Sequence, residues 1–134
     1  MNIATMKDLL SASRTQTQAQ RLLFVFTKAE LPEDSSPEQH AQFVAERGDA
    51  LVPVACVDKT PDEITGMAQL VKESQDLGVA WTVVFATSMS GKSGQAPSSA
   101  EAVPVLERVV AQIKAGQLDG LVPFDREGNT VNFQ

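Results

Sequence analysis

The chain has 134 residues, a length typical of one domain, and we expect a single globular domain over residues 1–134. Hydrophobic residues make up 43% of it and charged residues 21%, a balance that excludes an intrinsically disordered chain. The net charge of −6 repels phosphate backbones at long range and argues against nucleic acid as a partner.

Cysteine usage and hydropathy narrow the class of protein further. The single cysteine, Cys56, excludes an intrachain disulfide and a thiolate metal cluster. The first residues lack the charged start and long apolar run of a signal peptide, and no apolar run is long enough for a membrane span. We therefore expect a cytoplasmic protein with no membrane partner, no metal and no cofactor.

The pattern of apolar residues predicts a helix near the start of the chain, followed by three strands. Apolar residues at helical spacing predict a short first helix from Ile3 to Leu10, and the polar stretch 13–20 indicates a fraying helix end or a linker. Apolar runs without alternation, typical of strands covered on both faces, follow at 22–26, 50–58 and 81–87. Because Pro53 cannot donate a ladder hydrogen bond, the second run is expected at a sheet edge or a bulge.

Three capping boxes predict helices in the connections between these strands. Each starts with a hydroxyl residue and has Gln or Glu three positions later, and the boxes begin at Ser36, Thr60 and Ser98. Of these three connecting helices, one is expected around 41–44 and one from Thr60 to just before Gly78. The last is expected from Ser98 to Lys114, followed by Gly116. The tail, 120–133, reads as two strands around a turn at 126–129.

This order of elements predicts an α/β fold. We expect a single layered domain with a mostly parallel or mixed sheet, helices between the strands and a C-terminal β-hairpin. The alternative is an α+β domain in which the hairpin and Pro53 indicate a mostly antiparallel sheet.

The stretch ATSMSGKS, residues 86–93, matches the loose pattern of a phosphate-binding loop. That chemistry requires a helix to begin at the Gly-Lys-Ser triplet, because the helix amino end supplies amide donors and a favourable dipole. Here Gly94 and Pro97 follow within five positions, and the next helix is predicted to start at Ser98. We therefore expect a strand-to-helix loop and no nucleotide-binding loop.

Polar residues follow each of the buried runs. If the strands are parallel, their carboxyl ends meet at one edge of the sheet, where ligands bind in open α/β sheets. Lysines and hydroxyls there would form a local site for a phosphate-bearing small molecule. The candidate anion ligands are Lys28, Asp58, Lys59, Thr60, Ser90 and Lys92. The competing interpretation is that these lysines are solvated and the hydroxyls are helix caps.

No residue is assigned a catalytic role. His40, the single histidine, is expected to be exposed on a short helix, and Cys56 is expected to be an inert core thiol within a strand. No metal-ligand spacing is present.

Four segments resemble a family of small uncharacterised bacterial proteins. They are RLLFVFTKAELPED, ALVPVACVDKTPDEI, APSSAEA and LVPFDREGNTVNF. Members of this family often carry the label "ribonucleotide reductase subunit alpha", which implies radical chemistry on ribonucleotides. That reaction needs a large barrel with paired cysteines, whereas Cys56 stands alone here, so the sequence does not support the label.

Two functions are predicted from these observations. The first is a non-enzymatic binding or accessory module, with a homodimer as the expected assembly. The second is a binder of a phosphate-containing small molecule, or an enzyme acting on one, that uses the strand-end lysines.

Overall fold

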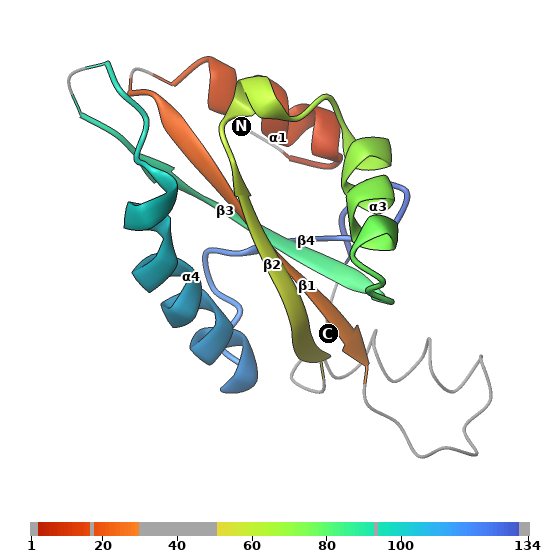
Figure 1. Ribbon diagram of the computed structural model, residues 1–134. Helices are drawn as coiled ribbons and strands as arrows, with labels where there is room; N and C mark the ends of the chain where they lie inside the picture. The colour runs from red at the N-terminus through yellow and green to blue at the C-terminus, as the bar shows by residue number, and fades with distance from the viewer. Residues whose placement is uncertain (1–2, 17, 30–50, 93, 132–134) are drawn as a thin grey trace, which may run out of the picture.

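Four strands form the centre of the computed structural model, which describes residues 3–16, 18–29, 51–92 and 94–131. The strands are β1 (Gln20–Ala29), β2 (Leu51–Lys59), β3 (Val83–Ser90) and β4 (Val122–Phe124). Their order in the sheet is β2-β1-β3-β4, and every neighbouring pair is antiparallel (Figure 1). The predicted mostly parallel or mixed sheet is therefore wrong.

The connection between β1 and β2 explains this difference. Ala29, the last residue of β1, pairs with Leu51, the first residue of β2, so the chain leaves and re-enters the sheet at the same end. A parallel neighbour would need a crossover along the full strand. Strands β2 and β3 do run in the same direction, but β1 lies between them.

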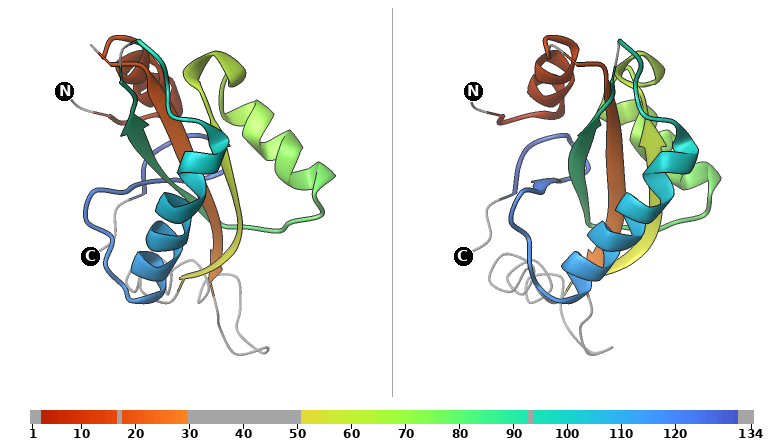
Figure 2. Two further views of the ribbon diagram at one scale, coloured as in Figure 1. Left: turned by 60° about the vertical axis from the view of Figure 1, so that its left-hand side comes forward. Right: turned by 90° about the vertical axis from the view of Figure 1, so that its left-hand side faces the viewer.

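Helices cover both faces of the sheet, as Figure 2 shows. Helices α1 (Met6–Arg14) and α3 (Met67–Asp76) pack on one face, against Phe24 and Phe26 of β1. Helix α4 (Ser99–Lys114) packs on the other face, against Leu23 and Val25 of the same strand. Every residue from 22 to 26 is buried, which confirms the prediction of a strand covered on both faces.

The ends of α4 form as predicted. The Ser98 hydroxyl accepts a hydrogen bond from the Glu101 N–H, and the helix runs from Ser99 to Lys114. At the other end, the Gly116 N–H donates to the Ile113 carbonyl, and Gly116 has a φ of 75°. Helix α1 also forms; its amino end is a capping box between Thr5 and Asp8.

The helix predicted from Thr60 is broken in two. The capping box forms, but it starts only the short 3-10 turn η2 (Pro61–Glu63). At Ile64 the backbone becomes extended, and the Ile64 side chain is fully buried in the core beneath α1 and α3. Helix α3 then starts afresh at Met67. Burial of Ile64 outweighs the local preference for a continuous helix.

The predicted C-terminal hairpin forms only in part, because among the described residues β4 is a strand and the chain after the turn is not. After β4, the Asp125 carboxylate accepts hydrogen bonds from two amides of the turn, those of Glu127 and Asn129. The returning chain then makes single bridges, Phe124 to Thr130 and Thr5 to Asn129, the second of which joins the turn to the start of α1.

Strand β2 lies at an edge of the sheet, and its register shifts opposite Phe26 and Thr27, so that Val54 is an extra residue. Both features confirm the expectation from Pro53. His40 and the helix predicted around 41–44 lie outside the described residues. Among the helices of the described ranges, none has the length and apolar character needed to cross a membrane.

Candidate functional site

The antiparallel sheet separates the three candidate lysines. Lys28 pairs with Val52, whereas Lys59 pairs with Leu22, six residues earlier in β1. At about 3.3 Å per residue, these positions lie about 20 Å apart along the sheet. Because β2 and β3 run in the same direction, Lys59 and Lys92 lie at one end of the sheet and Lys28 lies at the other.

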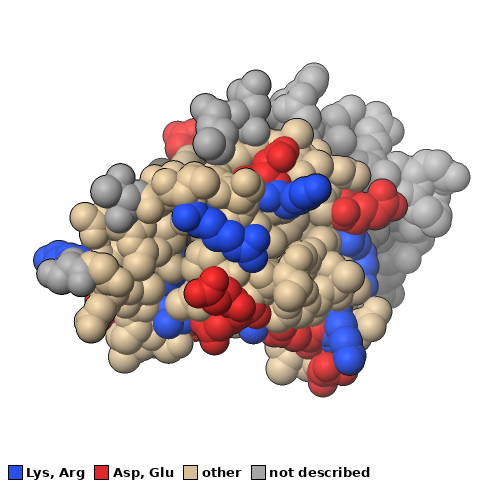
Figure 3. Space-filling view, turned by 90° about the horizontal axis from the view of Figure 1, so that it is seen from above, with Lys and Arg blue, Asp and Glu red and all other residues tan. Residues whose placement is uncertain are grey.

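The end with Lys59 carries charges of both signs. Seen from above, basic and acidic side chains lie next to one another there, and neither sign forms a continuous patch (Figure 3). A surface of this kind favours ion pairs within the protein over a strong local field for an anion.

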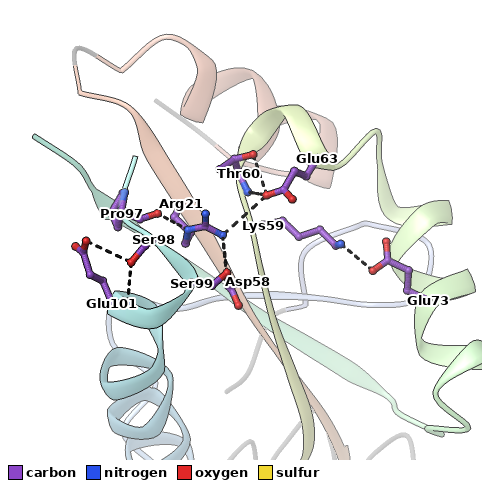
Figure 4. Close-up of polar contacts among 10 residues, drawn as sticks. All are labelled: Arg21, Asp58, Lys59, Thr60, Glu63, Glu73, Pro97, Ser98, Ser99 and Glu101. Carbon is purple, nitrogen blue, oxygen red and sulfur yellow. Dashed lines mark hydrogen bonds and ion pairs between the residues drawn. The ribbon is translucent and has the colours of Figure 1, made fainter. Parts of the chain in front are cut away.

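A sheet-end cluster of Arg21, Asp58, Glu63 and Ser99 occupies this end (Figure 4). Arg21 belongs to β1, and its side chain lies between the end of β2 and the start of α4 (Figure 4). Its Nη1 is 2.6 Å from Asp58 Oδ2. The same carboxylate oxygen accepts a hydrogen bond of 2.6 Å from the Ser99 hydroxyl. Arg21 Nε donates to the carbonyl of Pro97, which ties β1 to the loop before α4.

The Arg21–Asp58 pair is largely withdrawn from solvent. The side chains are 13% and 20% exposed, so water screens their attraction only in part. Glu63 lies 3.9 Å from Arg21 Nη1 at the open side and is far more exposed. Asp58, predicted as an anion ligand, is therefore the internal counter-ion of Arg21.

Lys59 and Thr60 also have partners within the protein. Lys59 Nζ lies 2.9 Å from Glu73 Oε1 on α3. The Thr60 N–H and hydroxyl donate to Glu63 Oε1 at 2.8 and 3.0 Å. These contacts join the end of β2 to η2 and α3.

The two carboxyl groups that accept these contacts, Glu63 and Glu73, both have a lowered pKa. Hydrogen bonds from the Thr60 backbone and side chain, aided by the nearby cations, lower the pKa of Glu63. Partial burial raises the pKa of Glu73, but hydrogen bonds from Lys59 and Gln69 and the Lys59 charge outweigh it, so the pKa is lowered. Both carboxylates thus stabilise the fold above their unfolded pKa, and this stabilisation is lost as the pH falls through the lower folded values.

Ser90 and Lys92 belong to the tip that follows β3. The Ser90 hydroxyl accepts a hydrogen bond from Gln20 Nε2. Lys92 and Gln95 exchange two backbone hydrogen bonds of 3.1 and 3.0 Å, which close a tight turn, and the Lys92 side chain is exposed. Helix α4 starts seven residues after Lys92, which confirms that no helix begins at the Gly-Lys-Ser triplet.

Sequence reasoning missed Arg21, Glu63, Glu73 and Ser99. Arg21 is the second residue of β1, and in this antiparallel sheet the start of β1 lies beside the ends of β2 and β3. The signal that could have identified Arg21 is its place directly before a buried apolar run. Using that signal also requires the correct strand direction. Ser99 follows the cap of α4, so its position was predictable but its partner was not.

A second feature lies between α4 and the edge strand. The α4–β2 hollow, of about 360 Å³, is lined by Cys56, Val103, Leu106, Glu107 and Val110. The Val103 side chain is 52% exposed and Cys56 is exposed. Cys56 therefore faces an apolar surface hollow, where the sequence indicated a thiol buried within a strand.

Neither a metal site among the described residues nor membership of a known family has support. Within residues 3–16, 18–29, 51–92 and 94–131, no three His, Cys, Asp or Glu side chains gather as metal ligands. No protein-family model matches the chain, and neither a curated protein nor a solved structure matches it. The family resemblance stays a prediction.

Proposed function

We propose that this protein is a non-enzymatic binding or accessory module that forms a homodimer through the face made by α4 and the edge of β2. The observation that carries the proposal is the apolar α4–β2 hollow with exposed Val103 at its rim. Single exposed apolar residues are common, but here the hollow adjoins a strand at the edge of the sheet.

The low charge of this face is compatible with a second copy as the partner. The net charge of −6 makes two copies repel each other at long range, so a dimer needs a contact surface with few charges. Residues 51–57 of β2 carry no charge, and of the residues that line the hollow only Glu107 does. A two-fold axis beside this face would bring identical apolar surfaces together.

Light scattering after size exclusion tests the dimer, from low micromolar to near-millimolar protein. We expect the wild type to dimerise and Val103→Glu to weaken dimerisation about tenfold or more, because a buried unpaired carboxylate is costly. Leu77→Glu is the matched control, since Leu77 is 60% exposed and follows α3 on the other face. In the dimer, the Cys56 thiol should react more slowly with a maleimide.

Two results would contradict the dimer proposal. One is a wild-type protein that stays monomeric over the whole concentration range. The other is a dimer that Leu77→Glu disrupts as strongly as Val103→Glu does.

The second candidate function is binding of a phosphate-bearing small molecule, or an enzymatic reaction on one, at the sheet end. The observation that favours it is that four of the predicted ligands, Lys59, Thr60, Ser90 and Lys92, lie at this end of the sheet. The pairing of Lys59 with Glu73 weakens it, because an anion would have to displace that carboxylate.

Thermal shift with inorganic phosphate and with magnesium–ATP tests this candidate. We expect Lys59→Ala and Lys92→Ala each to reduce a ligand-induced rise in Tm by about half or more. Lys28→Ala is the matched control, because Lys28 lies at the opposite end of the sheet. If neither ligand raises Tm, or if Lys28→Ala reduces the rise equally, this candidate is rejected.

A further inference from the structure

A groove lies beside α1, on the face of the sheet opposite α4. This α1–α3 groove has a volume of about 610 Å³, within the range of small-molecule sites. Residues of α1, of the segment that leads into α3 and of the turn after β4 line it. Its lining includes Lys7, Leu10, Ser11, Arg14, Met67 and Glu127.

The lining combines an apolar floor with cationic side chains. Leu10 and Met67 line the groove although they are only 3% and 8% exposed, so their surfaces form its bottom. Lys7 and Arg14 are seven residues apart on α1, which places them two turns apart on the same face, about 10 Å along the axis. Both side chains are exposed to solvent.

Arg14 is held in position across one end of the groove. Its Nη2 donates to the carbonyls of Pro61 and Ile64 at 3.1 and 3.3 Å. The hydrogen bonds that the structure describes for Arg14 use Nη2, which leaves its Nε and Nη1 N–H groups as donors for another acceptor. A cation fixed in this way loses little side-chain entropy when it binds an anion.

We propose that the α1–α3 groove binds a small organic anion that has an apolar body and a negatively charged head group. The apolar body contacts Leu10 and Met67, and the head group lies beside Lys7 or Arg14. The Glu127 carboxylate also lines the groove, so it repels the negatively charged head group and lowers the affinity for the anion. The site is independent of the dimer face, so either proposal can fail without the other.

Fluorescence titration with anilinonaphthalene sulfonate, an apolar body with an anionic head, tests the site in the full chain. Lys7→Gln should weaken binding of this probe about three- to fivefold, and Glu127→Gln should strengthen it by a similar factor. The neutral analogue N-phenylnaphthylamine should bind all three proteins equally. Lys114→Gln is the matched control, because Lys114 lies in the last turn of α4 on the other face.

A variant that fills the groove separates this site from other apolar surfaces. Ser11 is exposed and lines the groove, so Ser11→Trp should abolish binding of both probes while the far-UV spectrum is unchanged. Ser11→Glu, which adds little volume, should abolish binding of the anionic probe alone. The proposal is overturned if Val103→Glu removes probe binding and the Ser11 variants do not. It is also overturned if Lys7→Gln and Glu127→Gln shift the affinity in the same direction.

Discussion

Replacing Gly91 with Ala is expected to destabilise the protein by about 2 to 3 kcal/mol, the upper range for overpacking. A Cβ atom built on Gly91 would lie 1.7 Å from the Gln95 carbonyl oxygen and 2.9 Å from the Ala96 Cα. These are backbone atoms, so relief requires the whole turn between β3 and α4 to shift. The turn leads to Pro97, whose carbonyl is a partner of Arg21.

Urea unfolding at equilibrium measures this effect, with Gly66→Ala as the matched control. An added Cβ at Gly66 meets no atom within 4 Å, so that variant should change the free energy of unfolding much less. Equal losses for the two variants would show that the turn relaxes freely and that the close approach at Gly91 has no energetic consequence.

Replacing Asp58 with Ala is expected to cost about 2 kcal/mol of stability, because it leaves the mostly buried Arg21 without its counter-ion. The carboxylate oxygen lies 2.6 Å from Arg21 Nη1 and also accepts the Ser99 hydroxyl. The remaining acidic group near Arg21 is Glu63, at 3.9 Å. The loss lies below that of a fully buried pair, because the Asp58 side chain retains 20% exposure.

Glu73→Ala provides the comparison for Asp58→Ala. The Glu73 side chain is 33% exposed in its pair with Lys59, so we expect a cost below about 1 kcal/mol. Addition of salt should reduce the effect of Glu73→Ala more than that of Asp58→Ala, because exposed pairs are screened more strongly. If Asp58→Ala costs no more than Glu73→Ala, the Arg21–Asp58 pair is not a determinant of stability.

Local sequence signals identified α4 and the strands. The Ser98 cap and the Lys114–Gly116 stop define α4 through contacts within a few residues, so the structure confirms them. The unbroken apolar run 22–26 likewise required cover on both faces, whatever the strand direction. The same local reasoning failed between Thr60 and Met67, where burial of Ile64 by distant elements breaks the helix.

The candidate site was harder to predict from the sequence than the fold was. Lys28 and Lys59 were grouped because both follow apolar runs, but that grouping depended on parallel strands. The antiparallel pairing of β1 moves Lys28 to the far end and brings Arg21 into contact with Asp58 instead. No residue near Arg21 in the sequence indicates that partner.

The sequence by itself determined the apolar runs, the helix caps and the late start of α4, seven residues after Lys92, since these depend on short-range hydrogen bonds and side-chain patterning. Only the tertiary structure decided the strand directions, the pairing of Arg21 with Asp58, and the α4–β2 hollow and α1–α3 groove. Strand direction depends on the end of the sheet at which the chain returns, and residues far apart in the sequence decide this through their pairing, as Ala29 and Leu51 do here. The Arg21–Asp58 contact at the sheet end follows from that antiparallel pairing.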